Sequence, residues 1–175
     1  MKIEEFQQQS VRTCPFNAAP ENIQEFNNLL GNYAMGLVGE HFEHQQALSQ
    51  IGEQVGPNDI QNVFKEIGDQ MHYAVNLLTL MDEDFDERKL TSVVLSEDIE
   101  KAFGDVLEIP KKYIYHGHTL DREGFTAAVY MVISKLYEFH RSSMPEILQM
   151  NIDKLKKRYP EKFTVEDSIA RVDEK

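Results

Sequence analysis

Two short stretches of the chain, residues 39–43 (GEHFE) and residues 66–69 (EIGD), each carry two acidic side chains three positions apart. Residues three apart lie on one face of an α-helix. If the two stretches lie on neighbouring helices, four carboxylates meet at one place, where their like charges repel. A divalent cation that prefers oxygen ligands, such as Mg²⁺, is the simplest compensation. The two stretches therefore predict a metal site between two helices.

Apolar residues around both stretches repeat at the helical spacing of three or four. The first apolar stripe runs from Ile23 to Leu48 and passes through Glu40. A second apolar row, on the next helix, passes through Glu66 and Asp69. Acids of a solvated face would lie opposite such stripes, and buried acids without partners cost several kcal/mol. We therefore expect the acids to face inward, where a cation neutralises them.

The whole pattern predicts an all-α fold, a helical bundle of two helical hairpins with additional N- and C-terminal helices. The first hairpin is expected to contain a helix capped by Asn22 that ends near Ser49, and a helix capped by Asp59 that ends near Met81. We treat residues 1–175 as a single domain.

The remaining segments are predicted from apolar spacing and from proline and glycine positions. A short helix is expected over residues 1–13, with Phe6 as the apolar anchor. Two helices are expected in the second hairpin, from residue 96 or 97 to about 109 and from 121, with Asp121 as cap, to about 142. A helix from residue 145 should end before 160, and a short one should begin at 164 before the chain frays. Pro110 is expected to end or bend the third helix. The expected connections are residues 14–20, a solvated linker over 82–89, an extended stretch over 90–95 and a loop over 111–120. The N-terminal segment is residues 1–20 and the C-terminal tail is residues 164–175.

The composition excludes several classes of protein. The 175 residues carry a formal net charge of −12 and the pI is about 4.9, which is unlike a domain that binds the phosphate backbone of nucleic acids. Cys14 is the one cysteine, so an internal disulfide is excluded. No apolar run approaches the roughly 20 residues of a membrane span, and residues 1–9 are unlike a signal peptide. We expect a cytoplasmic protein that binds neither nucleic acid nor a membrane.

Three segments of the chain resemble a known family. Residues 36–43 (GLVGEHFE), 66–73 (EIGDQMHY) and 151–160 (NIDKLKKRYP) are similar to the MazG-like nucleoside triphosphate pyrophosphohydrolases, an all-α superfamily, and especially to its phage-type members. The chain departs from the family at two segments that usually lie between the two acidic pairs. Here Lys111-Lys112 and residues 116–121 (HGHTLD) follow the second acidic pair.

The resemblance implies hydrolysis of a (deoxy)nucleoside triphosphate between its α- and β-phosphates, with Mg²⁺ as cofactor and Mn²⁺ as a possible substitute. The implied metal ligands are Glu40, Glu43, Glu66 and Asp69, and Glu43 is also the expected catalytic base toward water. The residues expected to bind the substrate carry basic or amide side chains: Lys65, Lys111, Lys112, Asn151, Lys154 and Arg158. Because proteins of this family usually associate, a homodimer or a higher homo-oligomer is implied.

Two other functional classes stay open at this point. A carboxylate-bridged di-iron or di-manganese bundle uses acids together with Glu-x-x-His pairs on facing helices, and Asp69 with His72 is a partial match. A non-enzymatic helical module would use the acidic bundle to bind a partner.

The second hairpin echoes the first in one segment. Residues 104–108 (GDVLE) have the same arrangement of glycine and acids as residues 39–43. The helix that follows them, around residues 129–137, has no acidic pair. This difference indicates an old duplication in which one half keeps the metal site.

Overall fold

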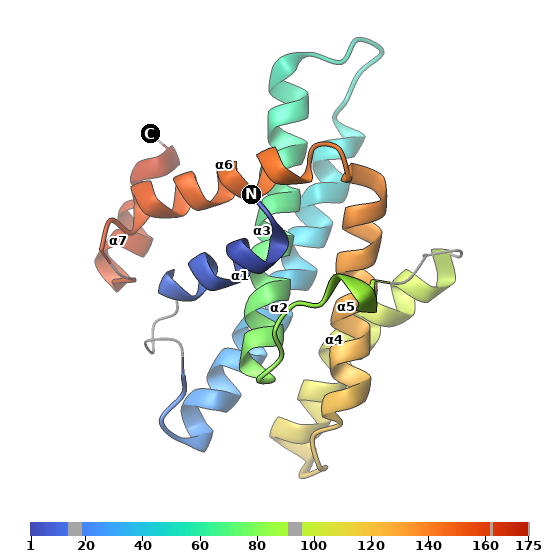
Figure 1. The fold of residues 1–175 in the computed structure, drawn as a ribbon, viewed down its shortest axis with the longest axis vertical. Helices are drawn as coiled ribbons and strands as arrows, with labels where there is room; N and C mark the ends of the chain where they lie inside the picture. Colours follow the sequence, from blue (N-terminus) through green and yellow to red (C-terminus); the bar gives the residue numbers. More distant parts are fainter. Residues whose placement is uncertain (14–18, 91–95, 162, 175) are drawn as a thin grey trace.

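The computed structural model describes residues 1–13, 19–90, 96–161 and 163–174, and these residues form helices and loops without a strand. Seven α-helices follow one another along the chain in Figure 1: α1 (Ile3–Ser10), α2 (Ile23–Ser49), α3 (Pro57–Leu80), α4 (Ser96–His116), α5 (Arg122–His140), α6 (Met144–Arg158) and α7 (Val165–Ala170). The described residues also contain three short 3-10 helices: η1 (Val11–Thr13), η2 (Glu87–Lys89) and η3 (Val172–Glu174). The predicted all-α fold of two hairpins with additional terminal helices is confirmed.

The α2–α3 hairpin is the central element, and it contacts α1, α4, α5 and α6 (Figure 1). Asn22 caps α2 as predicted, because its side chain accepts a hydrogen bond from the backbone N–H of Glu25 at 3.0 Å. The cap predicted for α3 is wrong. The helix begins earlier, at Pro57, and the Asp59 carboxylate accepts a hydrogen bond from the N–H of Gly56 at 2.8 Å. Proline suits the first helical position, where its missing N–H needs no partner.

Close packing between α2 and α3 depends on Gly36. A Cβ atom at this position would lie 2.4 Å from Cε1 of Tyr73, so only glycine leaves room for the ring. Most of the predicted stripes are buried, but their ends are not. Four apolar residues in the first or last turn of α2, α3 or α5 are exposed: Ile23, Leu48, Ile60 and Phe139.

The α4–α5 hairpin differs from the prediction in the length of α4, which continues through Pro110 to His116 instead of ending near residue 109. A proline inside a helix costs about 3 kcal/mol. Packing beyond the proline offsets part of this cost, because the ring of Tyr113 meets that of Phe26 edge-on with centroids 6.2 Å apart. The chain turns only at Gly117, which has a φ of 70°. The first part of the loop predicted over residues 111–120 is therefore helical.

The helices that follow begin where the sequence predicts. The side chain of Asp121 caps α5 by accepting a hydrogen bond from the N–H of Gly124 at 3.0 Å. Pro145 lies in the first turn of α6, which ends at Arg158, before Pro160. Both helices thus have the bounds expected from their caps and prolines, to within about two residues.

The N-terminal helix α1 packs against α3 and α6, with Phe6 fully buried as predicted. Gln7 joins this helix to residues 82–89, which the sequence predicts to be a solvated linker. Its side-chain amide donates to the carbonyl of Glu83 at 2.9 Å and accepts from the N–H of Phe85 at 2.7 Å. Because Phe85 is also buried, the linker is partly fixed to the core.

The C-terminal tail also has more structure than predicted. It contains α7 and then η3 in place of a frayed end. The guanidinium of Arg158 donates two hydrogen bonds to the carboxylate of Asp173, at 2.5 and 2.6 Å. The Asp173 side chain is only 2% exposed, so this pair fastens the tail to α6.

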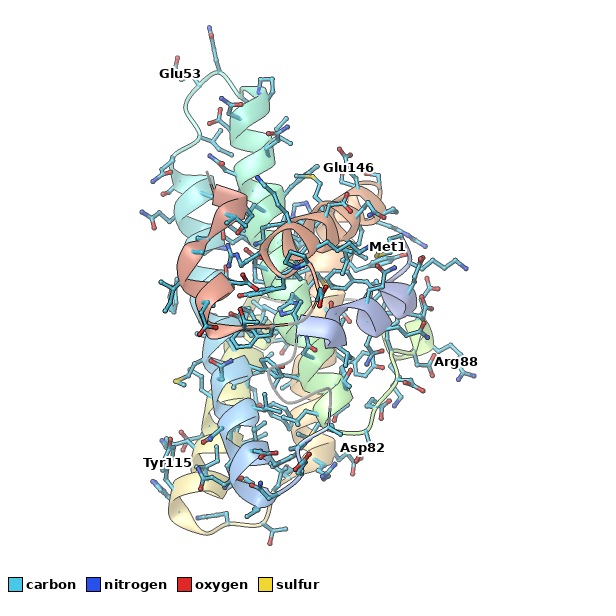
Figure 2. All side chains as sticks on the ribbon, turned by 90° about the vertical axis from the view of Figure 1, so that its left-hand side faces the viewer. Met1, Glu53, Asp82, Arg88, Tyr115 and Glu146 are labelled. Carbon is cyan, nitrogen blue, oxygen red and sulfur yellow. The ribbon has the colours of Figure 1, made fainter. Side chains whose placement is uncertain are left out.

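The hairpins give the molecule an elongated shape. The connection between α2 and α3, with Glu53, lies at one end, and the end of α4, with Tyr115, lies at the other (Figure 2). Cys14 and most of the stretch predicted as extended, residues 91–95, lie outside the described residues. None of the described helices combines the length and the apolar composition that a membrane crossing requires.

Candidate metal centre

Three of the four predicted metal ligands meet in the α2–α3 hairpin. One carboxylate oxygen from each of Glu40, Glu43 and Glu66 lies within 4.8 Å of the other two. Glu40 and Glu43 lie one turn apart on α2, and Glu66 faces them from α3. Glu66 is buried, Glu40 is partly buried and Glu43 is exposed, so the cluster extends from the core to the surface. In the described part of the chain, no other group of acids, histidines or cysteines has this geometry.

Negative charge exceeds positive charge in the acid cluster, where three carboxylates meet and Lys65 contacts one of them. Burial raises the pKa of Glu40 to about 8, and the neighbouring carboxylates act in the same direction. Oε1 of Glu66 lies 3.3 Å from Nζ of Lys65, whereas Oε2 of Glu66 is buried with no hydrogen-bond partner among the described residues. A buried carboxylate oxygen without a donor is costly. A cation bound to these oxygens would supply the missing charge, and an all-oxygen donor set suits Mg²⁺.

The fourth predicted ligand, Asp69, has a different environment. Its Oδ1 accepts a hydrogen bond from Nδ2 of Asn151 at 2.6 Å, and its Oδ2 lies 2.5 Å from Nζ of Lys154. Both partners belong to α6, and the side chains of Lys154 and Asp69 are only 18% and 14% exposed. Asp69 still contributes to the raised pKa of Glu40, so it lies at the edge of the acid cluster. A metal ion would compete with Lys154 for this carboxylate.

The close approach of α6 to α3 depends on Gly68. A Cβ atom at Gly68 would lie 3.0 Å from Cβ of Asn151 and 3.4 Å from the carbonyl oxygen of Ile147. Without that Cβ, α6 lies near enough for Asn151 and Lys154 to contact Asp69. Asn151 is buried, and its Oδ1 has no hydrogen-bond partner among the described residues. The site therefore contains a second polar oxygen whose bonding is incomplete.

Lys65 and Arg158, which the sequence predicts to bind substrate, are placed differently from each other. Lys65 lies beside the acid cluster through its contact with Glu66. Arg158 belongs to the same helix as Lys154, but its guanidinium is engaged by Asp173. Reaching a substrate would require Arg158 to leave this pair.

Lys111 and Lys112 contact an acid of their own helix. Nζ of Lys111 lies 2.5 Å from Glu108, and Nζ of Lys112 lies 3.5 Å from the same carboxylate. Neither lysine contributes to the pKa shift of Glu40. The structure thus brings Asn151, but neither of these lysines, to the predicted acids.

His72, on which a di-iron or di-manganese site would depend, is not part of the acid cluster. Burial lowers the pKa of His72 to about 4. Its Nδ1 lies 3.4 Å from the side-chain amide of Asn76, and its ring meets that of Tyr73 edge-on. The described acid cluster therefore consists of carboxylates without an imidazole ligand, unlike the Glu-x-x-His pairs of a di-iron bundle.

Sequence reasoning does not single out a second polar pair, His44 and Gln70. Nε2 of Gln70 lies 3.1 Å from Nδ1 of His44, and both residues are buried. Burial lowers the pKa of His44 to about 4, so its ring is neutral near pH 7. The position of His44 on the apolar stripe of α2 is the signal that identifies it. Gln70 gives no such signal, because the predicted apolar row of its helix passes through Glu66 and Asp69 and not through Gln70.

Comparison of the chain with protein-family models, curated proteins and solved structures gives no match. The function is therefore inferred from the residues and geometry of the acid cluster.

Proposed function

We propose that the protein is a Mg²⁺-dependent nucleoside triphosphate pyrophosphohydrolase. The main support is the meeting of Glu40, Glu43 and Glu66, with a buried oxygen that lacks a partner. A second support is the pair of α6 side chains, Asn151 and Lys154, that contact Asp69 at the edge of this cluster. Mg²⁺ in enzymes is usually held by one or a few carboxylates together with substrate phosphates and water. An acid cluster next to an ammonium group suits such a metal–triphosphate complex.

Each residue has a role in this proposal. Mg²⁺ bound at the acids would neutralise part of the triphosphate charge and make water a better nucleophile. The buried Glu66 and partly buried Glu40 would hold the metal, and the exposed Glu43 would take the proton from the attacking water. Lys154 exchanges its contact with Asp69 for a phosphate oxygen. Hydrolysis breaks the phosphoanhydride bond between the α- and β-phosphates. The products are therefore a nucleoside monophosphate and pyrophosphate.

Release of pyrophosphate from a panel of ribo- and deoxyribonucleoside triphosphates with Mg²⁺ tests the proposal. We expect at least one substrate to be hydrolysed, and EDTA to abolish the reaction. Glu40→Gln removes one metal ligand and should lower kcat/KM by at least about a hundredfold, since even residues that only orient ligands contribute about 10–100-fold.

Asp105→Asn is the matched control for Glu40→Gln. Asp105 belongs to the segment of α4 that echoes residues 39–43, but it pairs with Lys101 on its own helix. This variant should keep full activity. Absence of pyrophosphate with every triphosphate would contradict the proposed reaction, and full activity in Glu40→Gln would contradict the proposed metal site.

We also infer that the protein forms a homodimer or a higher homo-oligomer. Met35 and Phe42 lie two turns apart on α2 and are 64% and 67% exposed. Such apolar side chains on one helix face suit contact with a second copy of the chain. Sedimentation analysis over a range of concentrations tests this inference, and a monomer at every concentration would contradict it.

A further inference from the structure

The C-terminal tail, residues 163–174, turns back onto the helix that borders the acid cluster. The chain leaves α6 at Arg158, forms α7 and returns with η3, which packs against α6 (Figure 1). The return depends on Arg171, between α7 and η3, whose φ of 42° lies in the left-handed region. Residues other than glycine adopt this region rarely, because Cβ approaches the following carbonyl oxygen. The closed tail is therefore held against a backbone cost.

A charged pair is the main attachment of the tail. The guanidinium of Arg158 donates two hydrogen bonds to the carboxylate of Asp173, and the two side chains are only 14% and 2% exposed. Apolar packing contributes little, because no described residue of the tail belongs to the buried core. Ile169 is 78% exposed and Val172 is 40% exposed. Closure of the tail thus depends on charge, and another anion can compete for the same guanidinium.

The positive charges around Asp173 belong to the part of α6 that borders the acid cluster. Lys154 lies one turn before Arg158 on this helix. Burial alone would raise the pKa of Asp173, but the hydrogen bonds from Arg158 and the charges of Arg158 and Lys154 lower it. Nζ of Lys154 also contacts Asp69, at the edge of the acid cluster. Asp173 therefore lies near two cations, one of which reaches the candidate metal centre.

Tyr73 provides a second link between Arg158 and the acids. Burial raises the pKa of Tyr73 to about 12, and the charges of Glu40 and Asp69 act in the same direction. The charge of Arg158 opposes them. One phenol thus responds both to a candidate metal ligand and to the guanidinium that Asp173 engages. The guanidinium is close enough to the acid cluster for a phosphate group on a bound metal to compete with the tail.

We propose that the C-terminal tail is an internal inhibitor of the candidate metal centre, in which the carboxylate of Asp173 occupies the place on Arg158 where a phosphate group of the substrate binds. Carboxylate and phosphate groups use the same N–H groups of a guanidinium, so one excludes the other. The tail must open before the substrate binds fully, and the apparent affinity falls with the fraction of open molecules. This inference rests on the proposed function, but its main test needs no hydrolysis.

Binding of inorganic pyrophosphate in the presence of Mg²⁺, measured by titration calorimetry, tests the proposal with Asp173→Asn. Asparagine has the shape of aspartate without its charge, so the attachment of the tail weakens. We expect the variant to bind pyrophosphate about tenfold more tightly than the wild-type protein, the gain expected if about nine in ten wild-type tails are closed. Equal or weaker binding by the variant would overturn the proposal, and so would the absence of binding by both proteins.

Glu166→Gln is the matched control for Asp173→Asn. It removes the same charge from the same tail, at an exposed position in the first turn of α7. Because solvent screens an exposed charge, the affinity for pyrophosphate should change by less than about twofold. An equal gain in the two variants would mean that the overall charge of the tail, and not the pair with Arg158, limits binding. That result would also overturn the proposal.

NMR of the ¹⁵N-labelled wild-type protein tests the opening of the tail without any substitution. As pyrophosphate and Mg²⁺ saturate the protein, the amide signals of Val172 and Asp173 should move toward the positions of an unfolded chain. In Asp173→Asn, the signals of residues 172 and 173 should lie near those positions before pyrophosphate is added. Unchanged tail signals at saturation would show that phosphate binds with the tail closed. This outcome would overturn the proposal even if the variant did not fold.

Kinetics separate the tail from the proposed reaction. If a triphosphate is hydrolysed, Asp173→Asn should lower its KM by the factor found for pyrophosphate and leave kcat nearly unchanged, because the tail competes with substrate. An unchanged KM would contradict the inhibitor role. If no triphosphate is hydrolysed, the proposed function fails, and the pyrophosphate titration still decides whether Asp173 competes with phosphate.

Discussion

The two helical hairpins carry acids at the same spacing, but those acids have different surroundings. In the α2–α3 hairpin, Glu40 and Glu43 face Glu66 across the helix interface, and Glu66 has an oxygen with no described partner. In the α4–α5 hairpin, Asp105 and Glu108 each lie against a lysine of their own helix. The first arrangement leaves charge for a ligand to neutralise, and the second neutralises it locally.

The residues that contact each acid explain this difference between the hairpins better than the spacing of the acids does. The α4 acids have lysines three or four residues away, where helical neighbours meet. The α2 acids have a third acid, Glu66, opposite them, and the lysines near this site contact Glu66 and Asp69: Lys65 and Lys154. An E-x-x-E pattern is therefore a metal-site signal only when its own helix supplies no cation, and α2 contains neither lysine nor arginine.

Among the changes that distinguish the two hairpins, removal of Lys154 should have the largest effect on the free energy of unfolding. Lys154→Met leaves the largely buried Asp69 beside the other acids, so the free energy of unfolding in EDTA should fall by about 3 kcal/mol. Mg²⁺ should restore part of this loss, because the metal replaces the lost positive charge. Urea unfolding with and without Mg²⁺ measures both values.

Lys112→Met is the matched control in the second hairpin, where the pair with Glu108 is about half exposed. It should change the free energy of unfolding by less than about 0.5 kcal/mol, with or without Mg²⁺. An equal loss for Lys154→Met in EDTA and in Mg²⁺ would show that the metal does not compensate for this lysine.

Adding a methyl group at Gly68 should have the next largest effect. Gly68→Ala places Cβ against Asn151, so it should destabilise the protein by about 1–2 kcal/mol and raise KM by moving α6 away from Asp69. Gly104→Ala is the matched change in α4, where a Cβ meets open space. It should stabilise the protein by about 0.5–1 kcal/mol, as alanine does inside a helix. Thermal unfolding and steady-state kinetics separate the two, and equal stability changes would contradict close packing at Gly68.

Sequence periodicity is sufficient to predict the fold and three members of the acid cluster. Glu40 and Glu66 interrupt apolar stripes, and a residue on a buried stripe faces the neighbouring helix wherever that helix lies. The caps at Asn22 and Asp121 are also readable, because they depend on hydrogen bonds within one turn. These features are local in the sequence.

The features that the sequence does not reveal depend on contacts between distant residues. Helix α4 continues through Pro110 because Tyr113 packs on Phe26, and no local rule contains that contact. Asp69 has the same spacing as a metal ligand, but α6 brings Lys154 to it from 85 residues away. Sequence patterns identify which side chains face inward, and the tertiary structure determines which partner each one meets.

A further contrast concerns pH, to which the two hairpins should respond in opposite directions. Without metal, burial raises the pKa of Glu40 from 4.5 to about 8. The folded state then keeps a proton that the unfolded state loses, so the stability from this group is complete below pH 4.5 and is lost as the pH rises through about 8. The hydrogen bond from Lys111 lowers the pKa of Glu108, so the stability from that group is lost as the pH falls below 4.5.

Unfolding of the metal-free protein between pH 4.5 and 8 tests the response of Glu40. The free energy of unfolding should decrease by at most about 1.4 kcal/mol per pH unit, and by less where solvent screens the partly exposed carboxyl. Glu40→Gln should remove this decrease, whereas Glu108→Gln should leave it in place. Saturating Mg²⁺ should also remove it, because the metal holds Glu40 ionised throughout. An unchanged decrease in Glu40→Gln would mean that another group binds the proton.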